Sequence, residues 1–379
     1  MGNLVGEGYC LFWCKIVFVK FLQDLFSFFG GKKKRPAPNY FISTSTQSND
    51  RVRRLGLSLP PAEGSAILDR SRLSIPAAER AEPAAPGESA APGKSAAPAE
   101  YKPDPYYDWV IDVDPGEGRF FTIEDVFGIF DLQWRQSFSR AAVYGFSLTN
   151  NRWTYALSGD GPERFGRLQI GVSLLSGSTQ LQNCFDSSAK KIRSFRTPGA
   201  TAQVSMTEPV EAAVARAKSL LLLKQELHHD IIVALKSDNF YPGLLAWDVL
   251  TETGLHWGDG DLFHWDNSPR EYGDDRFFSV WTSTAPGYFF PEAIKAGKFN
   301  PVDLVFGYWI GRSADPLEVF EAMMEVVAYC RQHLGGVLLG RDGQPFDVAA
   351  ERARLQQIVN AMVMKGFPPG SDKAVRIFQ

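Results

Sequence analysis

Apolar residues are distributed differently in successive parts of the chain, and the first part stands apart. Residues 9–29 are almost continuously apolar and aromatic, with Lys15, Lys20 and Asp24 as interruptions. A run of this length can span a bilayer as a helix, and its polar stripe also fits a helix lying in the membrane interface. A buried helix of a globular domain is the third interpretation. The first two predict a membrane anchor in residues 1–31.

The next part is polar and rich in proline and alanine. A basic cluster, residues 32–35, directly follows the apolar run, and such clusters favour the cytoplasmic side of a membrane and attract anionic lipid. Residues 36–104 contain few aromatic side chains, too few to offset the entropy of ordering. We therefore expect residues 32–104 to form a basic collar and a disordered linker. Its 69 residues after the collar would reach roughly 45–50 Å as a random coil.

A first folded module is predicted at residues 105–227. Residues 108–115 alternate in polarity like a half-buried strand, and Thr122 is a plausible N-cap for a short helix after it. Further strands are expected near residues 142–148, 167–175 and 201–206, with a polar loop before the last, and a helix over residues 210–227. This mixture predicts a small α+β module.

A second pass of similar order follows at residues 228–365. Its expected strands and helices are the strand 231–235, the helix 241–253, the strands 262–265, 277–283 and 304–310, the helix 317–334, a hairpin turning at Asp342-Gly343, and the helix 349–364. This order is typical of the split βαβ arrangement, an antiparallel sheet with helices packed on one face. The predicted fold class is therefore α+β, and residues 366–379 are expected to form a C-terminal tail.

Composition and charge restrict the possible functions. The net charge of −3 argues against a general nucleic-acid binder. An RRM-like module remains an alternative, because such a sheet can stack bases on exposed aromatics. However, acidic residues outnumber basic ones more than twofold between residues 230 and 342, which disfavours phosphate binding. Four scattered cysteines form no disulfide framework.

Catalytic motifs are not found in the sequence. It contains no glycine-rich phosphate loop, nucleophile elbow or zinc spacing. Asp259, Asp261, His264 and Asp266 have the residue types of a metal site, but strand alternation places Asp261 and His264 on opposite faces. His228-His229 are expected to have a capping or surface role. We therefore expect no enzyme activity, no cofactor, no metal and no small-molecule substrate.

Several stretches of the second pass resemble one known family when taken together. The stretches GLHWGDGDLFHW (254–265) and FFSVWTSTAPGYFFP (277–291), the strand 304–310, and Gly335-Gly336 before VLL are similar to the C-terminal FtsZ-binding domain of the ZipA family. The upstream module resembles an extended form of that family. The resemblance implies a cell-division adaptor that is attached to the bacterial inner membrane through residues 9–35. Its globular part would lie in the cytoplasm and bind the C-terminal tail of FtsZ, the tubulin-like division protein. A binding scaffold with a different partner is the alternative.

The resemblance also implies where the tail would bind. In the family, the helix-free face of the sheet forms a shallow apolar groove. The matching positions here are Ile232, Ala234, Gly260, Leu262, Trp281, Ser283, Leu304 and Phe306. Trp281 and Phe306 are the expected anchors, because a few desolvated side chains supply most of the affinity at such sites. The chain departs from the family pattern at Gly260, Ser283 and Ala285, where methionines and a lysine are common, and at the large Trp281.

Overall fold

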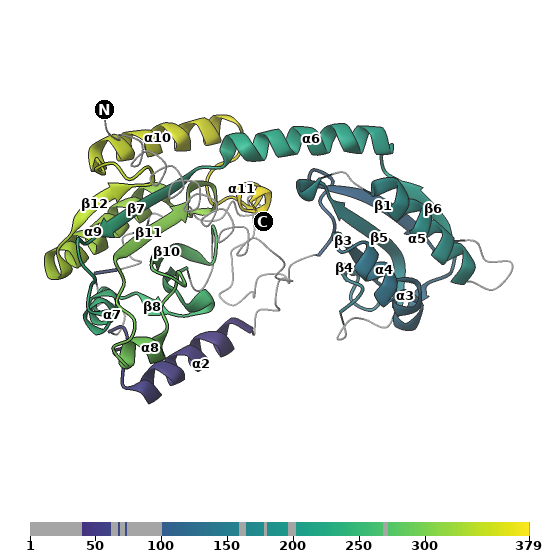
Figure 1. Cartoon of the computed structure of the whole chain (residues 1–379). Coiled ribbons are helices and arrows are strands. Elements are labelled where there is room, and N and C mark those ends of the chain that lie inside the picture. Colours follow the sequence, from purple (N-terminus) through teal and green to yellow (C-terminus); the bar gives the residue numbers. More distant parts are fainter. Residues whose placement is uncertain are drawn as a thin grey trace, which may run out of the picture. The chain divides into compact units, whose positions relative to one another are not determined.

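The computed structural model describes residues 40–61, 67–68, 73, 101–158, 164–177, 180–195, 202–267 and 272–378. These residues divide into two compact units, one comprising residues 1–82 and 228–379 and the other residues 83–227. Each unit contains an antiparallel sheet of six strands with helices packed against it, so the fold class is α+β, as predicted (Figure 1). Among the described residues, no helix is both long and apolar enough to cross a bilayer. The predicted anchor lies outside them.

The sheet of the first unit is built from the C-terminal part of the chain. Its strand order is β12-β7-β11-β10-β9-β8, with every pairing antiparallel. The strands are β7 (Asp230–Lys236), β8 (His256–Trp257), β9 (Phe263–Asp266), β10 (Arg276–Trp281), β11 (Asp303–Trp309) and β12 (Val337–Gly340). The first strand of this unit thus lies between its last two, an arrangement that needs a helical crossover.

Helices cover one face of this sheet. The long helix α9 (Pro316–Leu334) packs on β7 and β10 and carries α10 (Val348–Met364) on its outer side. Helix α7 (Gly243–Glu252) packs beside α9 and against β8, and α8 (Pro291–Lys295) lies next to α7. Asp315 caps α9 and Asp347 caps α10 through their side-chain oxygens. Such caps satisfy amide groups that have no partner inside the helix.

The C-terminal residues are part of this unit, which corrects the expected tail at 366–379. Helix α11 (Asp372–Ile377) begins at its cap Ser371. Val375, Ile377 and Phe378 are buried, and a side chain at Gly311 would collide with the Phe378 ring, 2.3 Å from the ideal Cβ position. The apolar residues that follow the last predicted helix therefore close the core.

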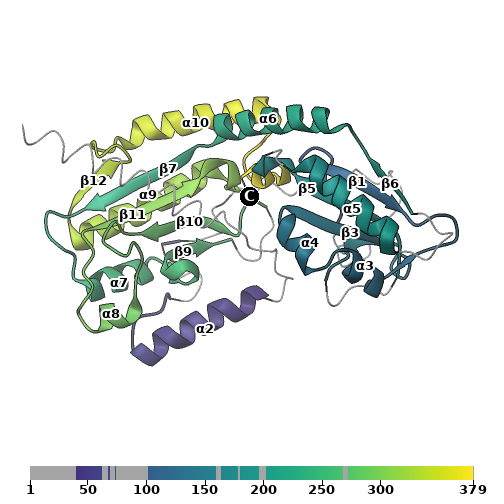
Figure 2. The ribbon, with the colours of Figure 1, turned by 45° about the vertical axis from the view of Figure 1, so that its right-hand side comes forward.

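A helix also lies within the stretch expected to be a disordered linker. Helix α2 (Tyr40–Leu55) packs against α8 and belongs to the same unit as the C-terminal sheet. In both views it lies alongside α8 (Figure 2). Composition gave no indication of this helix, because its order depends on contacts with residues far away in the sequence, such as Glu292, which is 241 positions from Arg51.

The second unit has its own sheet, in the order β4-β3-β5-β1-β6 with β2 paired to β5. The strands are β1 (Asp108–Asp114), β2 (Phe121–Thr122), β3 (Ala141–Ser147), β4 (Arg152–Tyr155), β5 (Arg164–Ser173) and β6 (Gln203–Met206). The helices are α3 (Ile123–Ile129), α4 (Leu132–Ser137), α5 (Leu181–Phe195) and α6 (Val210–Leu227). Thr122 caps α3 in a capping box with Asp125, as its position predicted, and α6 has its predicted bounds.

Helix α5 replaces the polar loop expected before β6. Leu181, Cys184, Ser188 and Ile192 lie on one side of the helix and are buried, the spacing of an amphipathic helix. The polar residues between them hid this pattern in the sequence.

The two sheets share the centre of their topology. In the first unit, the first strand along the chain, β7, lies between β11 and the last strand, β12. In the second unit, the first strand, β1, lies in the same way between β5 and the last strand, β6. The remaining strands are ordered differently, β10-β9-β8 in one unit and β3-β4 in the other.

Candidate functional site

The pairing of β7 with β11 determines which residues face the helices. Leu304 lies opposite Leu235 and Phe306 opposite Val233, whereas Val305 lies opposite Ala234 and Gly307 opposite Ile232. Directly opposed residues of an antiparallel pair share a face, and neighbours along a strand alternate. The β11 residues on the same face as Ile232 and Ala234 are therefore Val305 and Gly307.

Two predicted site residues consequently lie on the wrong face. Leu304 and Phe306 are fully buried in the core beneath α9, with Val233 and Leu235. The predicted register on β7 is right and that on β11 is shifted by one residue, which reverses every side chain of the strand. The sequence LVFGYWI is apolar at successive positions, so its alternation could not reveal the face.

Four side chains form an apolar cluster on the face opposite α9. They are Ile232 of β7, Val305 of β11, Trp281 of β10 and Leu262, which lies just before β9. The half-buried Ala234 and Tyr288 pack against them. The sequence predicted Ile232, Ala234, Leu262 and Trp281 and missed Val305 and Tyr288. We call these six residues the sheet-face cluster.

Trp281 determines the shape of this cluster. Its exposed fraction is 2%, and the Cη2 atom of its ring would lie 2.8 Å from a Cβ placed on Gly307. The missing side chain of Gly307 therefore makes room for the indole across the sheet. The floor of the cluster is closed, because Ile232, Leu262 and Val305 are at most 5% exposed. Ala234 and Tyr288 form its more accessible margin.

The remaining two predicted residues lie in turns beside the cluster. Gly260 is exposed in the 3₁₀ turn Asp259–Asp261 with a φ of 72°, a left-handed conformation that favours glycine. Ser283 follows β10, and its amide N–H donates to Asp303 Oδ1 at 2.7 Å while its hydroxyl donates to Oδ2. The Thr282 hydroxyl also donates to Asp303. Ser283 thus fixes the turn after β10.

The acidic residues around the 3₁₀ turn are each bound by protein groups. Asp259 pairs with Arg276 at 2.8 Å, Asp266 with His256 at 2.6 Å, and Asp261 lies 3.7 Å from Arg51. No cluster of three or more metal-ligating side chains occurs among the described residues.

His264 is buried between two oxygen atoms and stays neutral. Its Nε2 lies 2.7 Å from the Asp259 carbonyl oxygen and its Nδ1 lies 2.8 Å from Ser279 Oγ. A carbonyl only accepts, so Nε2 donates and Nδ1 accepts from the serine hydroxyl. Burial, with a smaller contribution from the Arg276 charge, lowers the pKa of His264 to about 3. The His264 ring therefore connects β9 to β10 and to the 3₁₀ turn.

Two titratable groups near the strands β8–β10 have raised pKa values. Burial and the neighbouring Asp274 carboxylate raise the pKa of Asp275 to about 6. Burial disfavours the charged form of His256, but the Asp266 carboxylate outweighs this effect and raises its pKa.

His228, expected at a cap or surface, packs with two aromatic rings. Its ring centre lies 5.3 Å from that of Trp309 and 6.0 Å from that of Phe378.

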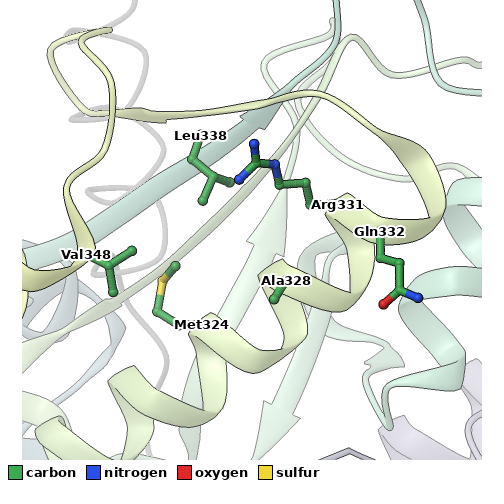
Figure 3. Close-up of a pocket in the computed structure, with 6 residues that line it drawn as sticks. All are labelled: Met324, Ala328, Arg331, Gln332, Leu338 and Val348. Carbon is green, nitrogen blue, oxygen red and sulfur yellow. The ribbon is translucent and has the colours of Figure 1, made fainter.

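A separate hollow lies on the helical side of the sheet (Figure 3). It has a volume of about 590 Å³ and lies between α9, β12 and the start of α10. Its lining residues are Met324, Ala328, Arg331, Gln332, Leu338 and Val348. None of them belongs to the sheet-face cluster.

The described cysteines carry no sign of reactivity. Cys184 and Cys330 are free and buried, and burial raises the pKa of the Cys184 thiol to about 12. A buried thiol that stays protonated is a poor nucleophile.

Comparison with known proteins identifies the C-terminal part of the chain. Residues 230–357 match the family model of the ZipA C-terminal FtsZ-binding domain. This is a family of protein-binding adaptor domains of cell division and not of enzymes. No curated protein matches the chain. The match covers the strands β7–β12 and most of α10. Residues 230–357 therefore form a domain of the ZipA C-terminal FtsZ-binding family.

Proposed function

We propose that the chain is a membrane-tethered adaptor that binds the C-terminal tail of FtsZ and links FtsZ filaments to the bacterial inner membrane during septum assembly. The observation that carries this proposal is the family match over residues 230–357. The globular units would then lie in the cytoplasm, with residues 9–35 at the membrane.

The sheet-face cluster is the proposed site of the tail. It combines aliphatic and aromatic side chains on the face opposite α9, the type of surface that takes a short peptide through a few apolar anchors. Tyr288 and Ala234 at its margin would contact the tail first. Trp281 and Tyr288 would have to shift for side chains of the tail to reach the closed floor.

The membrane part of the proposal is supported by sequence alone. A long apolar run precedes a cluster of four basic residues at 32–35. Each basic residue near an anionic surface contributes about 1 kcal/mol of attraction. The cluster would thereby add to the hydrophobic anchoring.

Flotation of vesicles with FtsZ filaments tests both parts. The full chain, bound to vesicles of phosphatidylethanolamine and phosphatidylglycerol, should carry FtsZ filaments to the top of a density gradient. Ala234→Lys, which places a charge on the margin of the cluster, should leave the filaments at the bottom. Val363→Lys is the matched control, because Val363 is 51% exposed on α10.

The possible failures of this experiment are distinct. If the wild-type chain floats and FtsZ does not, the proposed partner is wrong. If the chain itself does not float, the proposed membrane attachment is wrong. If Ala234→Lys carries filaments as well as Val363→Lys does, the tail binds elsewhere.

A further inference from the structure

The C-terminal domain already holds a segment of this chain from far away in the sequence. Arg51 of α2 donates from Nε and Nη2 to the two carboxylate oxygens of Glu292, both at 2.7 Å. Its Nη1 also lies 3.7 Å from Asp261. Two parallel charge-assisted hydrogen bonds fix the position and direction of the side chain more strictly than a single ion pair does.

Aromatic rings complete the receptor for this arginine. The guanidinium carbon of Arg51 lies 5.1 Å from the ring centre of Trp257 and 5.9 Å from that of Phe290. Cations within about 6 Å of such ring centres are attracted by the ring quadrupole. The Arg51 guanidinium is thus held by two carboxylates, Glu292 of α8 and Asp261 of the 3₁₀ turn. Two rings also contact it, Trp257 of β8 and Phe290 just before α8.

The contact extends beyond Arg51, and at Ser58 it reaches α7. Val52 is 1% exposed and Leu57 is buried. The Trp247 indole N–H donates to the Ser58 carbonyl at 3.0 Å, and the Ser58 hydroxyl donates to Asp248. One short segment thus combines a buried apolar side chain at Val52, a charged contact at Arg51 and a hydrogen bond to the Ser58 backbone carbonyl.

Chain connectivity gives this docking a consequence for the whole protein. Only residues 36–39 separate the basic cluster 32–35 from the start of α2. Four residues span at most about 14 Å. Without docking, the domain that begins at residue 228 is joined to the basic cluster only through residues 36–227, which include the whole second unit.

We propose that the surface formed by α7, α8 and β8 is a docking site for residues 48–61 of the same chain, and that this docking holds the tail-binding domain next to the basic cluster. Release of α2 lets the domain move away from the basic cluster, because only residues 36–227 of the chain then join the two. The docked and released forms therefore differ in the distance over which an FtsZ tail is captured. The docking rests on the contacts above, and the effect on reach rests on the proposed membrane attachment.

Hydrogen exchange of the full chain tests the docking itself. Arg51→Ala should raise the exchange rate of amides in residues 48–58 roughly tenfold or more, because it removes a charge-assisted bidentate pair. Val52→Asp should do the same through the apolar anchor. Arg53→Ala is the matched control, because Arg53 is 65% exposed on the same helix and pairs with Asp50. Unchanged exchange in both Arg51→Ala and Val52→Asp would overturn the docking site.

Energy transfer to the membrane tests the reach. A donor is placed as an unnatural amino acid at exposed residue 363, and the acceptor is a headgroup-labelled lipid in vesicles of phosphatidylethanolamine and phosphatidylglycerol. Transfer should fall at least twofold in Arg51→Ala and Val52→Asp and stay at the wild-type level in Arg53→Ala. Faster exchange with unchanged transfer would overturn the effect on reach. A wild-type chain that does not bind vesicles contradicts the membrane attachment, while the exchange experiment still tests the docking.

Discussion

Single residues decide which face of the C-terminal sheet is available to a partner. Gly307 leaves space for the Trp281 indole on one face, and the neighbouring Phe306 fills the core on the other. The two residues are adjacent in sequence and serve opposite faces of β11. The location of the site therefore depends on which residues of β11 lie on the face opposite α9.

Phe306→Ala should destabilise the domain rather than act as a clean binding variant. Truncating a fully buried phenylalanine typically costs about 3–5 kcal/mol, and Phe306 is 0% exposed. Chemical denaturation of the full chain measures the loss. Phe240→Ala, at a ring that is 65% exposed, should change stability by less than about 0.5 kcal/mol. A Phe306→Ala protein of wild-type stability would contradict the assigned register.

His264 makes the domain sensitive to acid. Its pKa is lowered to about 3 in the folded state, against about 6.5 in unfolded chains. The unfolded chain therefore binds a proton at higher pH than the folded one. The stability that the neutral ring contributes is complete above pH 6.5 and is lost as the pH falls toward 3.

The variant His264→Gln isolates this effect. The variant should be less stable than wild type at pH 7, because it loses the Asp259 and Ser279 hydrogen bonds. The difference in unfolding free energy should narrow by about 2 kcal/mol between pH 7 and pH 5, since one pH unit corresponds to about 1.4 kcal/mol per proton. Urea denaturation at the two pH values measures it. A constant difference would show that His264 does not titrate as described.

At the scale of elements, the sequence predicts those segments whose pattern has one interpretation. Helix α6 has its predicted bounds, and Thr122 caps α3 as predicted. The register chosen for β7, with Ile231, Val233 and Leu235 in the core, agrees with the structure, although Ile232 and Ala234 are apolar as well. The cap at Thr122 is purely local evidence, because the capping box lies within four successive residues.

The elements that the sequence missed depend on distant contacts. Helix α2 is ordered through Glu292, Trp257 and Trp247, which no local pattern reveals. Helix α11 closes the core because Gly311 leaves space for Phe378. Strand β11 is apolar on both faces, so its register required the pairing with β7. The same limitation explains why Val305 and Tyr288 were not predicted as members of the sheet-face cluster.

At the scale of the whole molecule, the two units share the central strand arrangement of their sheets. The family match covers only the C-terminal one. Helix α2 belongs to the same unit as the matched domain, although it precedes the second unit in the chain. The second unit is inserted between them in the chain.

Calorimetric titration of the full chain with a peptide of the FtsZ C-terminal tail tests the central claim most directly. The peptide should bind with a dissociation constant in the micromolar range, as short peptides in shallow grooves do. Tyr288→Ala should weaken binding about tenfold or more, since it removes an aromatic contact at the margin of the sheet-face cluster. Phe240→Ala, at an exposed ring outside the cluster, should bind like wild type. Absence of binding to the folded wild-type chain, or equal affinities of the two variants, would contradict the account.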